Sequence, residues 1–442
     1  MRSIPSQYIE RAYLGLFIIL IIAIPISKAL ASVAMGVLGG LSLIHLLTKP
    51  KQILPTFTAW PQIMALMLPF LFFGLSLLYT DDMRAGRKFW LMQNALFIVA
   101  GLVIVHAELL QRHYVLLLKT LIYTTSFTGM VTMLFYFLPE PQAIALAEFG
   151  QSLGMKEYIL HTKREAFGVY SPFIVRLQQS NLISISILSA FWLMAKGKVS
   201  RKILVWVAIL LASSLVLGGR GGQLGLLAGL GIWLISWGIR KFSPRLAPTL
   251  GAWGARVSIG VGSMIVLTLL PVAANYALPS VQERYNQLLW EIDTFYNGTY
   301  VNYDYVHFTG IRRIVSYQHT WEAITQNPIL GVGVGDYQQT LEDIYAKDEF
   351  EFPVNGHNHL LFLWLNTGLI GLLAFLLGWT YWAYQILQKR SWEDSTQAVS
   401  IIAFFLTIMM FDIMVTQIDT MIQPFIMGII AVVANIKPSA AA

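Results

Sequence analysis

Long apolar runs, separated by short polar stretches, dominate the hydropathy pattern of the chain. A helix that crosses a membrane needs about 20 mainly apolar residues. Marking the stretches from which charged residues nearly vanish gives twelve such segments. They are residues 12–27, 29–47, 60–80, 89–107, 114–137, 177–195, 203–218, 222–239, 257–275, 359–385, 396–414 and 420–436. The pattern therefore predicts an all-α polytopic membrane protein with about 12 transmembrane helices.

The composition supports this fold class and removes others. Hydrophobic residues make up 56% of the 442 residues and charged residues only 12%, against about 25% charged in a typical soluble domain. Most soluble enzyme classes are therefore excluded. The chain has no cysteine, which excludes disulfides, thiol nucleophiles and thiolate metal sites. We expect the first apolar segment to be retained, because no convincing signal-peptide cleavage site follows it.

The distribution of Lys and Arg predicts the orientation, because cytoplasmic loops are enriched in these residues. If Arg2 and Arg11 lie in the cytoplasm, most other short basic loops fall on the same side. These loops hold Lys49, Lys51, Arg112, Lys196, Lys198, Arg201, Lys202, Arg240, Lys241, Arg245, Arg256, Lys389, Arg390 and Lys437. Both termini are then expected in the cytoplasm. This topology explains the formal net charge of +7, so we expect no binding of nucleic acid.

One outer loop, residues 276–358, is long enough to form a small domain. We therefore divide the chain into helices 1–9 (residues 1–275), this loop, and helices 10–12 (residues 359–442). The loop holds eleven acidic residues and four basic ones. Apolar residues at helical spacing predict a helix inside it that ends near Pro328, followed by a glycine-rich turn at 331–335. Those apolar residues are Ile314, Tyr317, Trp321 and Ile324. A second outer loop covers residues 138–170.

Arginines at two places are candidates for binding an anion. Arg220 lies in the sequence GGRGG, where a new helix begins. A guanidinium beside exposed helix N–H groups favours phosphate, although a charge at a span end is also typical of an interfacial anchor. Arg312 and Arg313 open the helix predicted in the large loop. They would either face a ligand or lie on the loop surface.

His357 is the candidate for acid–base chemistry. It opens the tripeptide HNH, where the large loop re-enters the membrane. A helix N-terminus disfavours protonated histidine, so a neutral imidazole here suits a general base. A purely structural histidine is the alternative. A nuclease is not expected, because the chain offers neither a soluble fold nor access to DNA.

The predicted topology places Arg220, the Arg312–Arg313 pair and His357 at one depth, the outer membrane boundary. This favours binding of an anionic group with acid–base chemistry beside it. The turn at 331–335 lacks the lysine and serine of a P-loop, so a pre-activated donor such as a lipid-linked diphosphate fits better than ATP. Asp81 and Asp82 offer an alternative, a divalent-metal site, although adjacent basic residues favour a solvated loop.

These residues carry a resemblance to a known family. His357, Asn358, Gly368 and Gly371 match the pattern H-[NSQ]-x9-G-x-x-[GTY] of O-antigen ligases. Upstream, Arg313 precedes a Pro-x-x-Gly-x-Gly turn, and Arg220 matches an arginine that precedes the large loop in this superfamily. Four residues after Arg313, where the family often has Trp, this sequence has Tyr317. The superfamily also contains O-antigen polymerases and protein O-oligosaccharyltransferases.

The resemblance implies a metal-independent, inverting glycosyltransferase of the bacterial inner membrane that needs no cofactor. Its partners would be an undecaprenyl-diphosphate-linked O-antigen donor and a lipid A–core oligosaccharide acceptor, joined at the periplasmic face. His357 would deprotonate the acceptor, and Arg220 with Arg312 or Arg313 would bind the diphosphate. An O-antigen polymerase, a protein O-oligosaccharyltransferase and a non-enzymatic polysaccharide-lipid transporter remain alternatives.

Overall fold

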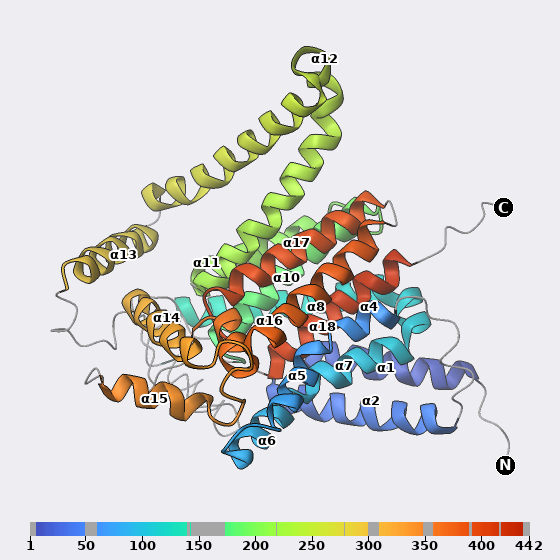
Figure 1. Cartoon of the computed structure of the whole chain (residues 1–442). Helices are drawn as coiled ribbons and strands as arrows, with labels where there is room; N and C mark the ends of the chain where they lie inside the picture. Colours follow the sequence, from blue (N-terminus) through green and yellow to red (C-terminus); the bar gives the residue numbers. More distant parts are fainter. Residues whose placement is uncertain are drawn as a thin grey trace.

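The computed structural model describes residues 6–48, 60–138, 142, 173–217, 219–277, 279–298, 309–347, 357–388, 391–414 and 417–435, and in these residues the chain is helical without any strand (Figure 1). The all-α prediction is therefore confirmed. The helices are α1 (Ser6–Ala23), α2 (Lys28–Thr48), α4 (Trp60–Ala65), α5 (Leu68–Ser76), α6 (Met83–Met92), α7 (Asn94–Val105), α8 (Ala107–Phe137), α10 (Arg176–Ala195), α11 (Ile203–Leu217), α12 (Arg220–Ala277), α13 (Pro279–Tyr296), α14 (Thr309–Gln326), α15 (Tyr337–Lys347), α16 (His359–Leu387), α17 (Trp392–Met409) and α18 (Gln417–Ala434).

A helix occupies each of the twelve apolar segments. Among the described residues, five helices are long and apolar enough to cross a membrane: Lys28–Thr48, Met83–Val105, Ala107–Leu134, Arg220–Ser263 and His359–Leu387. Shorter apolar helices lie at Trp60–Ser76, Ile203–Leu217 and Asp419–Ala434. The protein is thus a multi-pass membrane protein, while twelve crossings with both termini inside stay a prediction.

The basic loop expected between the eighth and ninth spans is itself helical. The two spans join as α12, which bends at Gly251, where φ is 70° and the backbone leaves helical geometry. Glycine adopts this left-handed conformation without the steric penalty of a β-carbon. In Figure 1 the resulting hairpin projects from the bundle and returns towards α13.

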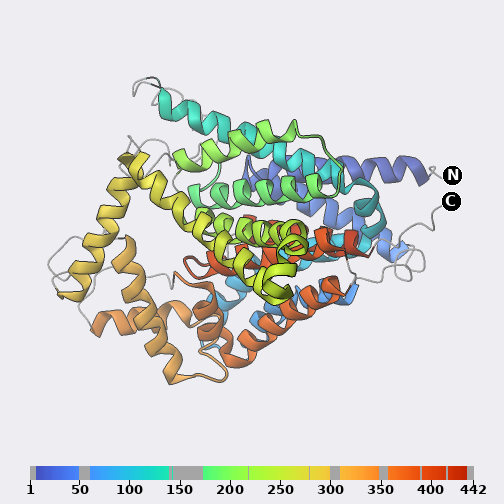
Figure 2. The same cartoon turned by 90° about the horizontal axis from the view of Figure 1, so that it is seen from above.

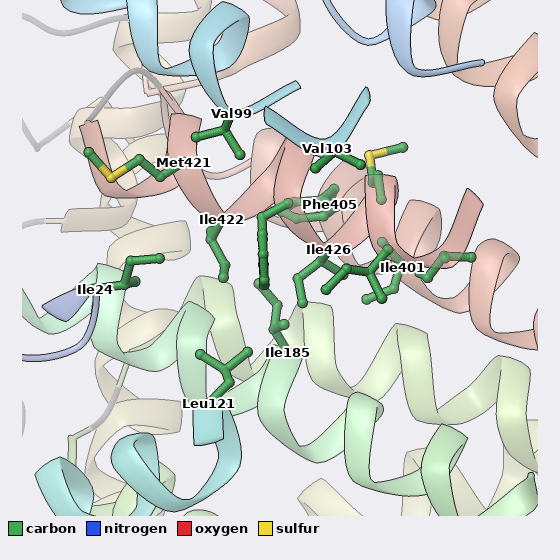
Figure 3. Packing of buried hydrophobic residues seen from close by; sticks show 14 of the residues in the cluster. Ile24, Val99, Val103, Leu121, Ile185, Ile401, Phe405, Met421, Ile422 and Ile426 are labelled. Carbon is green, nitrogen blue, oxygen red and sulfur yellow. The ribbon is translucent and has the colours of Figure 1, made fainter. Parts of the chain in front are cut away.

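Helices α10 and α18 form the centre of the bundle. Every residue of α10 from Gln178 to Ala190 is buried, and so is every residue from Asp419 to Ala434 of α18. In Figure 3, Ile185 of α10 and Ile426 of α18 lie close together among side chains of neighbouring helices. Their all-round burial matches helices enclosed on every side.

The large loop contributes α13, α14 and α15, which lie together at one end of the bundle (Figures 1 and 2). The helix predicted there is confirmed as α14, but its buried face differs from the predicted stripe. Ile311, Val315 and Ile324 are buried in a second apolar cluster with α15 and α16, whereas Trp321 is 50% exposed. Apart from Leu138 and Gln142, the 138–170 loop lies outside the described residues.

Candidate active site

Residues 328–336, which we call the docking turn, attach the large loop to α16. The N–H of Val332 donates to the carbonyl oxygen of Leu365 at 2.8 Å. Gly368 has a φ of 67° that interrupts α16, and a β-carbon there would collide with the carbonyl oxygen of Ile329. At Gly331, where φ is 74°, a β-carbon would meet the backbone of α16. The motif glycines therefore allow two backbones to touch.

The same turn binds the segment before α6. Both carboxylate oxygens of Asp336 accept backbone N–H groups, from Asp81 and Asp82, at 2.8 Å each. The Thr80 hydroxyl also donates to Asp336, at 3.0 Å. Asp82 is the N-cap of α6 and accepts from Ala85 at 2.9 Å. These contacts give the Asp81–Asp82 segment a structural role, and the described residues group no three His, Cys, Asp or Glu side chains as metal ligands.

The three residues of the tripeptide at 357–359 have different structural roles. Asn358 is the N-cap of α16, and its side-chain oxygen accepts from the N–H groups of Leu360 and Leu361 at 2.9 and 3.0 Å. His359 begins the helix and stacks on Phe362 in the core. His357 precedes the helix and, at 42°, is the one non-glycine residue with positive φ in the described part of the chain. Such strain concentrates at functional sites.

The His357 imidazole is held neutral and free. Its Nε2 atom is buried without a hydrogen-bond partner among the described residues. Burial, followed by repulsion from Arg313 and Arg312, lowers the pKa of His357 to about 4. The neutral form was predicted, but burial and arginines, rather than the helix dipole, are its main causes. A neutral imidazole with a free nitrogen can accept a proton.

Tyr317 of α14 fixes the backbone of His357. Its hydroxyl donates to the carbonyl oxygen of His357 at 3.3 Å and to that of Met410. One phenol therefore joins α14, the segment that leads into α16 and the C-cap of α17.

Arg220 is the first residue of α12, and its glycine neighbours serve helix packing. β-Carbons at Gly219 and Gly222 would collide with Ser180 of α10. The Ser180 hydroxyl instead donates to the carbonyl oxygen of Gly219 at 3.0 Å, and Ser184 donates to that of Gly222 at 2.9 Å. The glycines thus hold Arg220 against α10.

The predicted site residues come together around Arg313. It interacts electrostatically with Arg220 of α12 and with His357, and Arg220 also interacts electrostatically with Arg176 of α10. Arg312 interacts with His357. We call Arg176, Arg220, Arg312 and Arg313 the arginine cluster. Both Arg220 and Arg313 are half-buried. The strongest charge acting on Arg220 is the carboxylate of Glu291, followed by repulsion from Arg313 and Arg176, and positive charge in excess of this carboxylate favours a further anion.

Two acidic residues of this site were not singled out from the sequence. Glu291 of α13 interacts with Arg220 and Arg313. Asp412 lies in the turn after α17, outside the helix, where burial and then the nearby Asp419 raise its pKa to about 7. Arg313 also interacts electrostatically with Asp412, which lowers this pKa slightly. In the sequence, Asp412 is marked only by its place between two apolar segments. Glu291 is one of eleven acidic residues in its loop, so no pattern distinguishes it.

The arrangement combines four cations, a neutral histidine with a free nitrogen, and a membrane-embedded bundle beneath them. Comparison with known proteins gives a match in the part of the chain that carries these residues. No curated protein matches the sequence significantly. Residues 203–376, which contain Arg220, Arg312, Arg313 and His357, match the family model described as O-antigen ligase. From α11 into α16, the chain is thus similar to the O-antigen ligase family.

Proposed function

We propose that this protein is an O-antigen ligase that transfers glycan from undecaprenyl diphosphate to a hydroxyl of lipid A–core oligosaccharide. The observation that carries the proposal is the unpartnered, buried Nε2 of His357 beside the arginine cluster. The family already indicates a membrane glycosyltransferase with lipid-linked substrates. Donor, acceptor and residue roles are our proposal.

His357 acts as the general base in this proposal. Its Nε2 takes the proton from the acceptor hydroxyl while the hydroxyl oxygen attacks the anomeric carbon of the donor sugar. The bond from that carbon to the diphosphate oxygen breaks, and the sugar configuration inverts. A positioned general base contributes about 10²–10⁴-fold.

The arginine cluster binds the diphosphate and stabilises the charge that grows on it as the bond breaks. Arg220 and Arg313 are the favoured pair, because Arg313 faces both Arg220 and His357. Arg312 has a secondary role in this proposal. An anion here also offsets the repulsion that lowers the pKa of His357, so donor binding strengthens the base.

The proposed reaction takes place at the periplasmic face of the bacterial inner membrane, where the predicted topology puts the large loop. From there the lipid tails of the substrates would reach into the bilayer. It needs neither a cofactor nor a metal ion. Positive loops on the opposite side of the predicted topology support this orientation.

Purified protein incubated with an undecaprenyl-diphosphate glycan and lipid A–core, with chelator present, tests the proposal. The expected product is lipid A–core carrying the glycan. Elongated donor chains instead would identify an O-antigen polymerase. In a parallel reaction with a peptide acceptor, a glycosylated peptide would identify a protein O-oligosaccharyltransferase. Binding of the donor with no transfer to any acceptor would favour a transporter. Activity that is restored only by added metal would favour a metal site at Asp81 and Asp82 instead.

A further inference from the structure

We propose that Glu291 is a positioning residue that sets the spacing of Arg220 and Arg313 for the donor diphosphate by capping the helix that carries Arg313. The inference rests on the proposed function, because it concerns the same diphosphate site. It assigns a role to a residue that lies on a different helix from either arginine.

Glu291 joins α13 to the first turn of α14. Its Oε2 accepts the N–H of Gly310 at 2.5 Å and that of Ile311 at 3.1 Å. The first N–H groups of a helix have no partner within the helix, and a carboxylate there is further stabilised by the helix dipole. Arg313 follows two residues after Ile311, at the start of the second turn. The carboxylate therefore fixes the end of α14 from which Arg313 projects.

The carboxylate is built into the fold and is not a surface charge. Glu291 is 1% exposed, and its Oε1 is buried without a hydrogen-bond partner among the described residues. Burial raises its pKa, while the two backbone bonds, Arg220 and Arg313 oppose that rise. The side chain thus faces α12 and α14 at once.

Gly310 is shaped to receive this contact. A β-carbon at this position would collide with the Oε2 atom of Glu291. The glycine therefore lets the carboxylate reach the helix end closely, and Gly310→Ala is expected to displace it without removing any charge. Gly310→Ala therefore disrupts the contact between Glu291 and α14 from the α14 side.

The hydrogen bonds and the charge of Glu291 have opposite effects on an anionic ligand. The bonds place Arg313, which favours binding, whereas the negative charge repels the diphosphate. Glu291→Gln keeps an oxygen that accepts both N–H groups and removes the charge. Glu291→Ala removes both. If positioning dominates, the glutamine variant binds the donor at least as well as wild type and the alanine variant binds it poorly.

The test measures the Kd of full-length, detergent-solubilised protein for undecaprenyl diphosphate, together with Tm and transfer kinetics. The variants are Glu291→Gln, Glu291→Ala and Gly310→Ala. Ser391→Ala is the matched control, because Ser391 caps α17 by accepting from Asp394 at 3.3 Å, at the opposite end of α17 from Asp412. It removes a helix cap away from the arginine cluster.

We expect Glu291→Ala and Gly310→Ala to weaken binding of undecaprenyl diphosphate about tenfold, since small displacements of a charged clamp are costly. KM for lipid A–core should change less than about twofold. Glu291→Gln and Ser391→Ala should keep the wild-type Kd or, for the glutamine, lower it. If Glu291→Ala does not fold, Gly310→Ala and Glu291→Gln carry the test.

Wild-type Kd in Glu291→Ala or Gly310→Ala overturns the positioning role, and so does an equal loss in the glutamine and alanine variants. In these cases the wild type still binds and transfers, so the proposed function stands. A wild-type protein that binds no undecaprenyl diphosphate overturns the proposed function, and this inference with it.

Discussion

The docking turn and the arginine cluster lie near opposite ends of the first part of α16. They differ in how well their buried polar groups are hydrogen-bonded. In the docking turn, Asp336 satisfies the N–H groups of Asp81 and Asp82, and Val332 bonds to Leu365. Around His357, like charges face one another and a buried nitrogen has no partner among the described residues. Since an unsatisfied buried group is costly, the unpartnered His357 nitrogen among these charges favours this region as the one that binds and reacts, while the turn supports it.

The variant His357→Ala is the strongest test of this difference between the two regions. We expect transfer to fall by about 10²–10⁴-fold, because the proton acceptor is lost. Removing a strained, unpartnered side chain should leave Tm nearly unchanged. The measurement is the initial rate of glycan transfer to lipid A–core, with His113→Ala of α8 as a histidine control that keeps wild-type activity.

Next in size is the difference between the two neighbouring arginines. Arg313→Ala should lower transfer by about 10²–10³-fold, the usual cost of losing one charge-stabilising donor. Arg312→Ala should lower it less than about tenfold, because Arg313 faces more of the site. Steady-state rates at saturating acceptor compare the two. The reverse order would assign the diphosphate to Arg312.

A substitution in the docking turn should lower the stability of the protein rather than its activity. Asp336→Ala leaves the N–H groups of Asp81 and Asp82 without their acceptor and is expected to cost about 1–3 kcal/mol of unfolding free energy. Thermal unfolding in detergent reports this as a lower Tm. Per folded molecule, transfer should stay within about threefold of wild type. A normal Tm with abolished transfer would place Asp336 in the reaction instead.

The smallest expected effect is on the pH profile. Protonated His357 accepts no proton, so kcat/KM should fall as pH drops through about 4 in the free enzyme. With donor bound, the acid limb of kcat should move up towards the ordinary histidine value, about 6.5. Asp412 titrates near 7 and also faces Arg313, so Asp412→Asn is measured in parallel. An acid limb of kcat/KM above 6.5 that persists in this variant would contradict the assignment.

Hydropathy was enough to locate the helices, because a spanning helix needs only a long apolar run. It did not reveal that α12 stays helical through its basic segment up to the bend at Gly251, since propensity and charge give no tertiary packing. The buried face of α14 was misplaced because Trp321, apolar by type, packs edge-on against Trp364 and stays half exposed.

In the candidate site, too, some residues could be predicted from the sequence and others only from the structure. Arg220, Arg313 and His357 were selected from residue type, position at span ends and family resemblance, and the structure brings them together. Glu291 could not be selected, because its contacts with Gly310 and Ile311 cross between two helices. The physical role of Gly331 and Gly368 likewise required two backbones in contact, which no local pattern records.

The most direct test of the account measures Tm and transfer rate on the same preparations of His357→Ala and Asp336→Ala. We predict that His357→Ala unfolds like wild type but transfers at least about 100-fold more slowly. Asp336→Ala should unfold at a lower temperature but transfer normally per folded molecule. Near-normal transfer by His357→Ala, in protein made in normal amounts, would contradict the central claim that this histidine is the base.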